Sequence, residues 1–442
     1  TVPRMRPRQL AGVAERTVRN QFLTRLPLNL DARYERRIPD RMNLSTDAVQ
    51  TNLGRLTASL GAETRDDHRK RARDLFAGEL TLIGHTVHLE NPATVEWEDD
   101  RYASFPRLWT LQLYAFRPLE WAVFGVDPDD PLARKAVDVF DAWICDWRET
   151  TTVGVPGYLR GRWTPYAVSL RLVNWARYLT WRRAVLSGAG RSGDRTERAR
   201  AREMYKNALF LADHVEHDVG GNHLVENGVA LVVAGRLLAE QSWLRQGWDI
   251  LDDAARTQFL DDGGHFERSP MYHLMTTMRY LTACDLLDGH AEGSARTICE
   301  TARKAVDYLR YLRTPDGRLP LLNDAVRGQT VTIDDCLRYA DAIEVASEAA
   351  ATRSVPGETG YYWLANDAGN LLVDGGPVGP PHLPAHAHND LLQVLLWIDG
   401  HPIVTDTGVF EYAPGPRRQY ARSVSAHNTV QVDDVEPIHL GG

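Results

Sequence analysis

The sequence has few cysteines, few lysines and no long hydrophobic run. Its four cysteines, at positions 145, 284, 299 and 336, stand singly without a CxxC pair, which argues against a disulfide framework and leaves room for one bridge. Because no apolar run reaches the roughly 18 residues of a membrane-spanning helix, we expect no transmembrane segment. The first residues lack the apolar core of a signal peptide, so the location stays open: periplasmic or extracellular if such a peptide was removed, otherwise cytoplasmic.

The charge of the chain excludes one class of partner. The 51 basic residues include only four lysines, and the formal net charge is −8, so nucleic acid is not an expected partner. The many arginines suit planar carboxylate and sulfate groups, although a GC-rich genome explains them equally well. The 442 residues exceed the roughly 250–300 residues that one hydrophobic core usually serves, which predicts two domains.

Helical periodicity dominates most of the chain. Apolar residues recur at helical spacing, and the breaks between these segments are short and carry glycine or proline. A succession of helix pairs of this kind fits a helical (α/α) toroid better than a simple bundle. Helices are expected at residues 10–26, 64–75, 136–144, 165–181, 203–215, 224–244, 247–260, 271–287 and 295–312.

The pattern changes after about residue 354 to short strand-like segments separated by glycine and proline clusters. Asp399-Gly400 reads as a two-residue hairpin turn between the third and fourth of these segments. The chain is therefore expected to be an α+β multidomain protein, and its β part is too short for a complete sandwich, so we expect the natural protein to continue. The predicted domains are an N-terminal helical region (1–90), a toroid (91–353) and the start of a β domain (354–442), with strands at 360–364, 370–374, 391–397, 402–405 and 428–432.

Three histidines and one aspartate near the end of the chain form a candidate zinc site. His388 and Asp406 flank the predicted hairpin, which can fold them back beside each other, and His427 would come from the next strand. Two imidazoles and one carboxylate, with a fourth position free, suit Zn²⁺. His386 would share a strand face with His388, so one could bind metal while the other faces a substrate. Taken alone, His386 in its proline-rich loop would be an ordinary surface histidine.

Residues 220–228 form a second candidate site. Gly220 and Gly221 break the chain, and Asn222 is expected to cap the apolar helix that follows. The structural alternative is a plain N-cap next to an exposed His223. In the functional alternative, the amide and the imidazole both bond a substrate carboxylate beside a helix N-terminus, which favours anions.

A third polar cluster lies at residues 262–273. His265, Glu267, Arg268, Tyr272 and His273 fall within nine positions. A tyrosine at the start of a helix is usually a packing residue whose hydroxyl is in water, but the density of polar side chains here favours a chemical role. A phenol has an ordinary pKa of about 10, and nearby cations or a metal can lower it enough for proton transfer.

These motifs together resemble the heparinase II/III family of polysaccharide lyases. The resemblance covers roughly residue 80 to the end, and five motifs in a fixed order make it specific. The chain departs from the family pattern at Ala385, where a glycine usually precedes the first histidine of the pair. The matching stretches are residues 221–228, 262–273, 386–388, 406–408 and 422–429, with a further likeness at 163–175.

The resemblance implies an (α/α) toroid followed by an antiparallel β-sandwich. It also implies β-elimination of acidic, uronic-acid-containing polysaccharides of the heparin or heparan sulfate kind. Carried over to the matching positions, Asn222 and His223 would neutralise the substrate carboxylate. Tyr272 would act as base, acid or both, and His386 as a second base or acid.

The resemblance further implies residues that bind zinc and acidic sugar. His388, Asp406 and His427 would hold a zinc ion that is structural or lies near the active site. Further substrate-binding candidates are Glu226, Arg268 and Arg422.

Other functions stay open on the sequence alone. A glycoside hydrolase on an α/α toroid would need two carboxylates, for which Glu226 and Glu267 could be proposed. A non-catalytic protein that binds acidic glycans would need the arginines without Tyr272, and a structural zinc module is a third alternative. The sequence does not reveal which polysaccharide is cleaved, whether cleavage is endo or exo, or the oligomeric state.

Overall fold

Two compact units make up the described chain. The structure, a computed structural model, describes residues 7–21, 29–42, 44–187, 194–287, 293–345, 357–380, 384–438 and 440. The units are Pro7–Ile250, here the N-terminal unit, and Leu251–Gly442, here the C-terminal unit. The division falls within one helix, and each unit is described by itself. The domain boundaries expected near residues 90 and 353 divide the chain differently and stay predictions.

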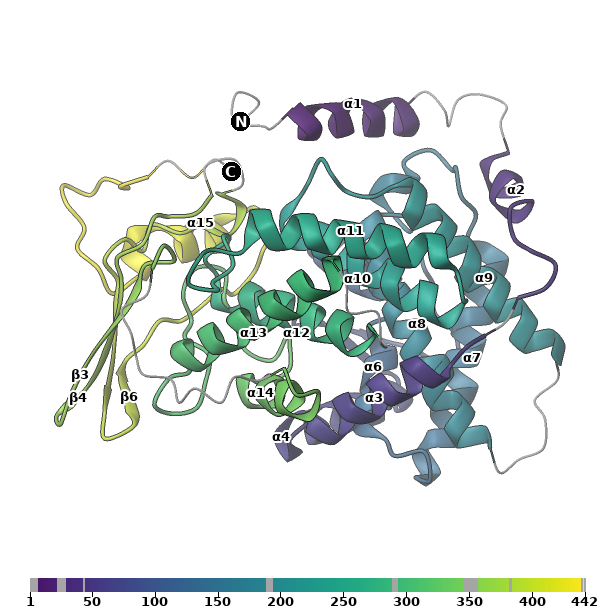
Figure 1. The fold of residues 1–442 in the computed structure, drawn as a ribbon, viewed down its shortest axis with the longest axis horizontal. Helices are drawn as coiled ribbons and strands as arrows, with labels where there is room; N and C mark the ends of the chain where they lie inside the picture. Colours follow the sequence, from purple (N-terminus) through teal and green to yellow (C-terminus); the bar gives the residue numbers. More distant parts are fainter. Residues whose placement is uncertain are drawn as a thin grey trace. The chain divides into compact units, whose positions relative to one another are not determined.

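The part of the chain that the structure describes contains fifteen α-helices and six β-strands, numbered in chain order in Figure 1. The strands are β1 (Glu79–Leu82), β2 (His85–His88), β3 (Tyr361–Asn366), β4 (Gly369–Asp374), β5 (Val394–Ile398) and β6 (His401–Val404). The helices are α1 (Pro7–Gln21), α2 (Leu30–Glu35), α3 (Asp47–Ser59), α4 (Ala62–Phe76), α5 (Arg107–Tyr114), α6 (Pro118–Gly125), α7 (Pro131–Thr150), α8 (Pro165–Leu186), α9 (Asp194–Asp213), α10 (Gly221–Leu237), α11 (Gln241–Gln258), α12 (Pro270–Asp285), α13 (Ser294–Leu312), α14 (Ile333–Ala342) and α15 (Pro416–Arg422).

Most of the predicted helices are present at their expected positions. For example, α8 starts at Pro165, because the fixed φ of proline suits the first helical position. The continuous helix predicted at 224–244 is wrong, since α10 ends at Leu237 and α11 starts at Gln241. Ala239 adopts a left-handed φ of 54° between them, and alanine gives no sequence signal for that conformation. Of the helix predicted at 10–26, α1 is described, and 22–26 lie outside the described residues.

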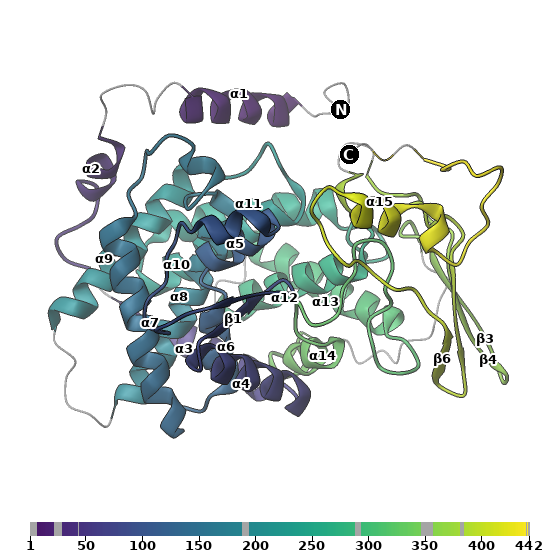
Figure 2. The ribbon, with the colours of Figure 1, turned by 180° about the vertical axis from the view of Figure 1, so that it is seen from behind.

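The N-terminal unit is built around α8. This helix packs against α6, α9 and α10, and nearly all of its side chains are buried, including Arg171. The Arg171 guanidinium donates to Asn207 Oδ1 (2.6 and 2.9 Å) and to the carbonyl of Tyr114 (2.8 Å), so its buried charge has partners. The β1–β2 hairpin follows α4, which packs along α6 (Figure 2).

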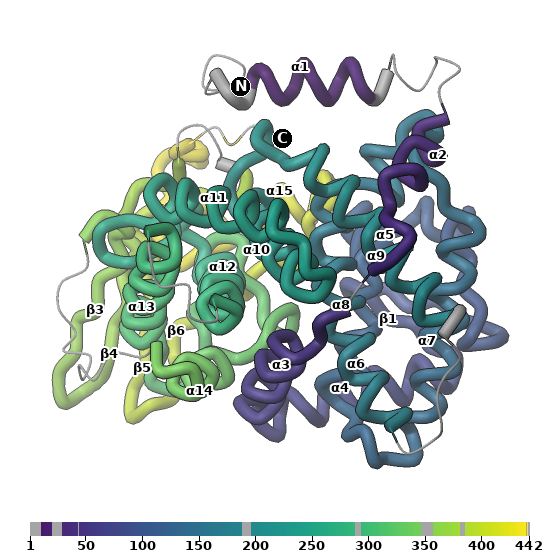
Figure 3. Tube along the Cα trace, turned by 45° about the vertical axis from the view of Figure 1, so that its right-hand side comes forward, coloured from purple at the N-terminus to yellow at the C-terminus, as the bar shows by residue number. Residues whose placement is uncertain are grey.

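The C-terminal unit combines helices with an antiparallel sheet (Figure 3). α12 and α13 pack against each other, and α14 packs against both. The sheet has the order β3-β4-β5-β6, with every neighbouring pair antiparallel. The β5–β6 hairpin turns at Asp399 (φ 49°) and Gly400 (φ 78°), as a two-residue turn with positive φ requires, so the predicted hairpin is confirmed.

The sheet has one buried face and one open face. The buried face packs on α13 in a cluster that contains Tyr308, Tyr311, Leu312, Leu322, Tyr361, Leu372, Leu395 and Trp397. On the other strand positions, Leu364 is 60% exposed and Ile403 56% exposed. The strand predicted at 428–432 is wrong, because the described residues there form bends and an isolated bridge between Val432 and Val435.

The predicted fold class is confirmed: a mostly helical chain is followed by an antiparallel β part. One disulfide joins Cys284 of α12 to Cys299 of α13, and Cys145 and Cys336 are free thiols. No helix in the described ranges combines the length and the hydropathy that a membrane crossing needs.

Candidate active site

The polar cluster at residues 262–273 is fixed in place by its first residues. The Asp262 carboxylate accepts hydrogen bonds from the backbone N–H of Gly264 (2.9 Å) and from both the N–H and the hydroxyl of Thr359 (2.9 Å each). A side chain at Gly264 would meet Thr359 Oγ1 at 2.0 Å, so only glycine fits there. The Asp-Gly-Gly start of this motif therefore has a structural task, which is to anchor the loop that leads into α12.

Two histidines of this cluster are buried and neutral. His273 accepts the His265 backbone N–H at Nδ1 (3.2 Å) and contacts the Ala305 carbonyl through Nε2 (3.0 Å). Burial lowers the pKa of His265 to about 4 and that of His273 to about 3. Both imidazoles are consequently part of the packing of the C-terminal unit rather than groups exposed to a ligand.

Tyr272 and His386 lie side by side in the C-terminal unit. Tyr272 stands in the first turn of α12, as predicted, and His386 ends a short 3₁₀ helix, Pro384–His386. Their ring centroids are 3.9 Å apart with 30° between the planes, and both side chains are partly exposed. The prediction that His386 and His388 share a strand face is wrong, because neither residue is in a strand.

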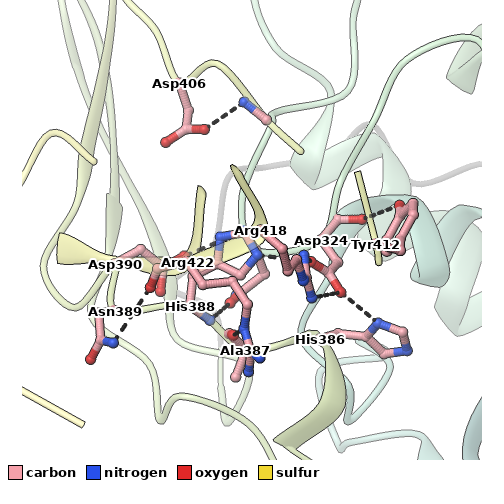
Figure 4. A network of polar contacts seen from close by, with 12 residues as sticks. Asp324, His386, Ala387, His388, Asn389, Asp390, Asp406, Tyr412, Arg418 and Arg422 are labelled. Carbon is pink, nitrogen blue, oxygen red and sulfur yellow. Dashed lines mark hydrogen bonds and ion pairs between the residues drawn. The ribbon is translucent and has the colours of Figure 1, made fainter. Parts of the chain in front are cut away.

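Asp324 is the centre of the polar network around His386 (Figure 4). Its Oδ2 lies 3.0 Å from His386 Nδ1, and its Oδ1 lies 2.8 Å from His388 Nε2. Arg418 of α15 donates to both carboxylate oxygens. Burial alone would raise the pKa of Asp324, but the hydrogen bonds from the two histidines and Arg418 outweigh it and hold the pKa well below its usual value.

The neighbouring Asn323 fixes how Asp324 is presented. Asn323 has a left-handed φ of 51°. Its amide oxygen accepts the His388 N–H (2.9 Å), and its amide nitrogen donates to the Arg268 carbonyl (3.0 Å). Sequence reasoning missed both residues; the adjacent amide and carboxylate after a proline-bounded apolar stretch, residues 319–324, were the available signal.

The predicted zinc ligands are arranged in two hydrogen-bonded pairs. His427 Nδ1 lies 2.8 Å from Asp406 Oδ2, while His388 bonds Asp324, and Asp406 is drawn apart from His388 in Figure 4. The rings of His388 and His427 are 5.2 Å apart. As the side chains lie, no group of three His, Cys, Asp or Glu residues among those described is close enough to hold a metal. Zinc at these residues stays a prediction.

The two arginines predicted to bind substrate contact protein carbonyls. Arg268 donates to the carbonyls of Glu358 (3.0 Å) and Phe266 (3.4 Å). Arg422 donates through Nε to the Ala387 carbonyl (3.0 Å), and burial together with the neighbouring charge of Arg418 lowers the pKa of Arg422. Their predicted role toward a substrate stays untested, and their observed contacts hold backbone segments.

The remaining predicted residues belong to the N-terminal unit, at the start of α10. Asn222 was expected to be the N-cap, and this is wrong: the N-cap is Gly220, so Asn222 lies in the first turn. Gly220 and Gly221 have φ of 70° and 55°, which explains the glycine pair. Glu226, one turn further, is buried.

His223 is held between a carboxylate and an aromatic ring. Its Nδ1 lies 3.3 Å from Glu216 Oε2, and its ring stacks on Tyr166 at 4.1 Å with 25° between the planes. Glu216 is buried and also contacts the Asn227 amide (3.3 Å). Burial would raise the pKa of Glu216, but the charge and the hydrogen bond of His223 outweigh it and lower the pKa. Sequence reasoning missed Glu216 and Tyr166, although Tyr166 falls in the 163–175 stretch that had been singled out.

Family models match two consecutive parts of the chain. The model described as "Heparinase II/III N-terminus" matches residues 94–350, and the one described as "Heparinase II/III-like, C-terminal" matches residues 351–442. The first match alone covers more than half of the chain.

Characterised relatives match about half of this chain. A protein of Bacteroides thetaiotaomicron named "Heparin-sulfate lyase" is 24% identical over 275 residues, which are 52% of this chain and 39% of the relative. A protein of the same name from Bacteroides stercoris is 24% identical over 255 residues, 50% of this chain and 38% of the relative. The matched segment thus spans about two fifths of each relative's own length.

Solved structures share the fold. A structure titled heparinase III aligns over 97% of this chain and 68% of its own, with a TM-score of 0.65 and 18% identity. A heparan sulfate lyase mutant from Pedobacter heparinus aligns over 92% of this chain and 65% of its own, with a TM-score of 0.52 and 18% identity.

Proposed function

The chain belongs to the heparinase II/III family, and we propose on this basis that it is a polysaccharide lyase. Its substrate is an uronic-acid-containing polysaccharide of the heparin or heparan sulfate kind, cleaved by β-elimination. One observation supports this most directly: a phenol and an imidazole, Tyr272 and His386, stack at a partly exposed position, and a buried carboxylate holds the imidazole.

The proposed reaction requires one base and one acid. The base removes the proton at C5 of the uronate, and the electron pair forms the C4–C5 double bond while the C4–O4 bond breaks. The acid supplies a proton to the leaving O4, so the products are an unsaturated uronate and a free hydroxyl. Positioned proton transfer of this kind contributes about 10²–10⁴-fold to a rate.

Tyr272 and His386 are the proposed acid and base. Which of them removes the C5 proton depends on the stereochemistry of the uronate, so the two assignments stay open. Asn222 and His223 keep their predicted role, which is to bond the substrate carboxylate as negative charge develops on it. Donors aimed at developing charge are worth about 3 kcal/mol each.

Zinc is part of the proposal, and two nitrogens fit it. His388 Nδ1 and His427 Nε2 are buried and have no hydrogen-bond partner within the described ranges. Each ring bonds a carboxylate through its other nitrogen, as metal-bound histidines do. Asp406 contacts His427 at Nδ1, so in this arrangement it supports a ligand. A zinc ion held by His388 and His427, and by Asp406 once its carboxylate turns from His427 to the metal, would brace the end of the chain and add positive charge.

A panel of polymers tests the lyase. The chain is incubated with heparan sulfate, unsulfated uronate glycosaminoglycans, alginate and a neutral glucan, and the ultraviolet absorbance of an unsaturated uronate is followed. Absorbance with at least one uronate polymer and none with the glucan is the expected result. Reducing ends that appear without absorbance would indicate a hydrolase, and no product from any polymer would refute the proposal.

Metal analysis tests the zinc separately. We expect about one zinc per chain, read by elemental mass spectrometry, and loss of that zinc in His427→Ala. A wild-type chain purified with zinc in the buffer that retains none would refute this part of the proposal and leave the lyase untouched.

A further inference from the structure

A pocket beside β6 in the C-terminal unit contains two arginines that none of the sequence motifs included. Its volume is about 330 Å³. We propose that this pocket, here the two-arginine pocket, binds a sulfate group carried by the polysaccharide. The inference rests on the proposed function and deepens it, because it names where sulfation would be recognised. The residues that line the pocket include Asp316, Arg318, Arg327, His401, Thr405 and Asp406.

The first arginine, Arg318, is presented by a turn that is fixed in place. In the turn that follows α13, the Thr314 N–H donates to the Arg318 carbonyl (3.1 Å), and the Thr314 hydroxyl accepts the Arg318 N–H (3.0 Å). Asp316 ties the same turn to the sheet, because its Oδ1 accepts the indole N–H of Trp397 (2.9 Å). The backbone of Arg318 is therefore held, while its side chain is 59% exposed and accessible to a ligand.

The second arginine, Arg327, carries a charge that has no counterion at contact distance. Among the described residues, no carboxylate forms an ion pair or a hydrogen bond with its guanidinium. Partial burial and the nearby charge of Arg318 lower the pKa of Arg327, and the charge of Asp316 only partly opposes them. Because a guanidinium keeps its proton in proteins, the two positive charges persist side by side. An anion bound in the pocket would relieve their repulsion.

The two carboxylates of the pocket are bonded within the protein. Asp406 accepts the Gly408 N–H on Oδ1 (2.7 Å) and the Gln393 amide on Oδ2 (2.8 Å). Asp316 uses Oδ1 to hold the turn and the sheet, and its Oδ2 lies 3.8 Å from Arg318 Nε, which is long for an ion pair. The carboxylates are thus occupied, and the two guanidinium groups remain for a ligand.

The lining and the size of the pocket match a sulfated sugar residue. Guanidinium groups bind oxyanions through forked hydrogen bonds. His401 at the start of β6 and Thr405 after its end are both exposed, and they add a ring nitrogen and a hydroxyl. Donors from several segments suit the tetrahedral oxygens of a sulfate ester better than the planar pair of a carboxylate. The volume lies at the lower end of small-ligand pockets, about 300–1,000 Å³, so a sugar ring fits as well as its sulfate.

The test compares a sulfated glycan with its desulfated form. A heparin hexasaccharide, and the same hexasaccharide after chemical desulfation, are titrated calorimetrically into the chain in a Tyr272→Phe background, which keeps the probe intact. We expect the sulfated form to bind at least about tenfold more tightly. Arg327→Gln should weaken binding of the sulfated form about tenfold, because charge-assisted hydrogen bonds are lost, and should change binding of the desulfated form less than about twofold. Arg318→Gln should act in the same direction by a smaller factor, because Asp316 accompanies its charge.

A matched control separates the pocket from the general attraction between an arginine and a polyanion. Arg303 of α13 is not among the lining residues, its side chain is 47% exposed, and it pairs with Asp307 at 3.5 Å. Arg303→Gln removes the same charge, so the ratio of the two affinities should stay within about twofold of wild type. An equal loss of that ratio in Arg303→Gln and Arg327→Gln would overturn the proposal.

Further outcomes decide the remaining cases. A wild type that binds both forms equally, or an Arg327→Gln variant that keeps the wild-type ratio, overturns the sulfate site. Millimolar sodium sulfate at constant ionic strength should change hexasaccharide binding less than about twofold, and a loss of about tenfold would assign the pocket to a free anion and overturn the glycan site. Should Arg327→Gln fail to fold, Arg318→Gln decides by the same ratio.

The proposed function fails by a different measurement. If wild type makes no unsaturated product from any polymer, the lyase is refuted, and the ratio of affinities still decides the pocket. If wild type makes unsaturated product but the ratio does not depend on Arg327, the pocket is refuted and the lyase stands.

Discussion

The two units each contain a histidine held between a buried carboxylate and a tyrosine ring. In the N-terminal unit, Glu216 bonds His223, which stacks on Tyr166. In the C-terminal unit, Asp324 bonds His386, which stacks on Tyr272. The bonding nitrogen is Nδ1 in both. Because the two arrangements share these three residue types, the charges that surround each carboxylate can be compared directly.

The two carboxylates differ in what balances their charge. Asp324 has Arg418 on both oxygens, and the Arg418 side chain is 9% exposed. Glu216 has an arginine, Arg16 of α1, only at 3.8 Å, and the Arg16 side chain is 32% exposed. The permanent charge of a guanidinium therefore balances the buried Asp324 carboxylate. Glu216 is balanced mainly by His223, whose charge and hydrogen bond lower the pKa of the buried carboxyl group against the effect of burial.

The largest expected effect separates the two tyrosines. Tyr272→Phe keeps the ring on His386 but removes the hydroxyl, so product formation should fall about 10²–10⁴-fold with little change in stability. Tyr166→Phe makes the same change in the other arrangement, and its initial rate should stay within about tenfold of wild type. Initial rates of ultraviolet absorbance increase measure both. Wild-type rates in Tyr272→Phe would remove this phenol from the mechanism.

The next effect concerns the charge on Asp324. Arg418→Gln leaves a buried carboxylate without its cation and should cost about 3–5 kcal/mol of unfolding free energy. His386→Phe should cost less, because Arg418 and His388 still bond Asp324. Urea unfolding at neutral pH gives both values. Equal costs for the two variants would mean that His386 also balances the charge.

Acid should destabilise both units. The pKa of His214, two residues before Glu216, is lowered to about 4 by burial, as is that of His265 near His386. The unfolded chain binds these protons more tightly, so the stability is present above about pH 6.5 and is lost as the pH falls toward 4. Each histidine should lower the free energy of unfolding by about 2 kcal/mol as the pH falls from 6.5 to 5.

Urea unfolding across this pH range measures the loss. His214→Gln and His265→Gln should each remove about 2 kcal/mol of the pH dependence. An unchanged pH profile in either variant would mean that the histidine is already charged in the folded protein.

The smallest effect tests the partner of Glu216. His223→Phe should cost about 1–3 kcal/mol, since it leaves a buried acceptor without its main donor. Arg16 also pairs with Asp218 at 2.5 Å, so Arg16→Gln is made in an Asp218→Asn background. There it should cost less than about 1 kcal/mol, because the remaining pair with Glu216 is long and partly exposed to solvent. At Glu216, loss of the histidine should therefore cost more unfolding free energy than loss of the arginine. At Asp324 the order is the reverse. A larger cost for Arg16→Gln in the Asp218→Asn background would remove the contrast between the two units.

The fold was predictable where the pattern is local. The helix at 295–312 was expected from its apolar spacing, and it is present as α13, Ser294–Leu312. The pair Asp399-Gly400 predicted the turn of the β5–β6 hairpin, and both residues have positive φ there. The break at Ala239 and the absence of a strand at 428–432 were not predictable, because they depend on tertiary contacts. For example, the Asn428 carbonyl accepts the Val394 N–H at the start of β5, although its own segment is bent.

The candidate site divides in the same way. Tyr272, His386 and His388 could be named from spaced motifs, since rare polar residue types stand close together there. Asp324 could not, because its partners come 62, 64 and 94 positions later in the chain and no local pattern marks it. Sequence reasoning missed Glu216 for a similar reason. A single glutamate in a short connection carries no local signal, and only the burial of its carboxylate shows that it needs a partner.

Asn323 has a consequence for how this protein tolerates change. Its backbone adopts a conformation that few residues accept, and its amide also bonds Tyr361 Oη (3.3 Å) besides the loops at 268 and 388. Glycine would keep the conformation and lose the bonds, aspartate would lose the donor, and a β-branched residue would lose both. In a library that samples every amino acid at every position, position 323 should be among the least permissive in the C-terminal unit, although it needs to touch no substrate.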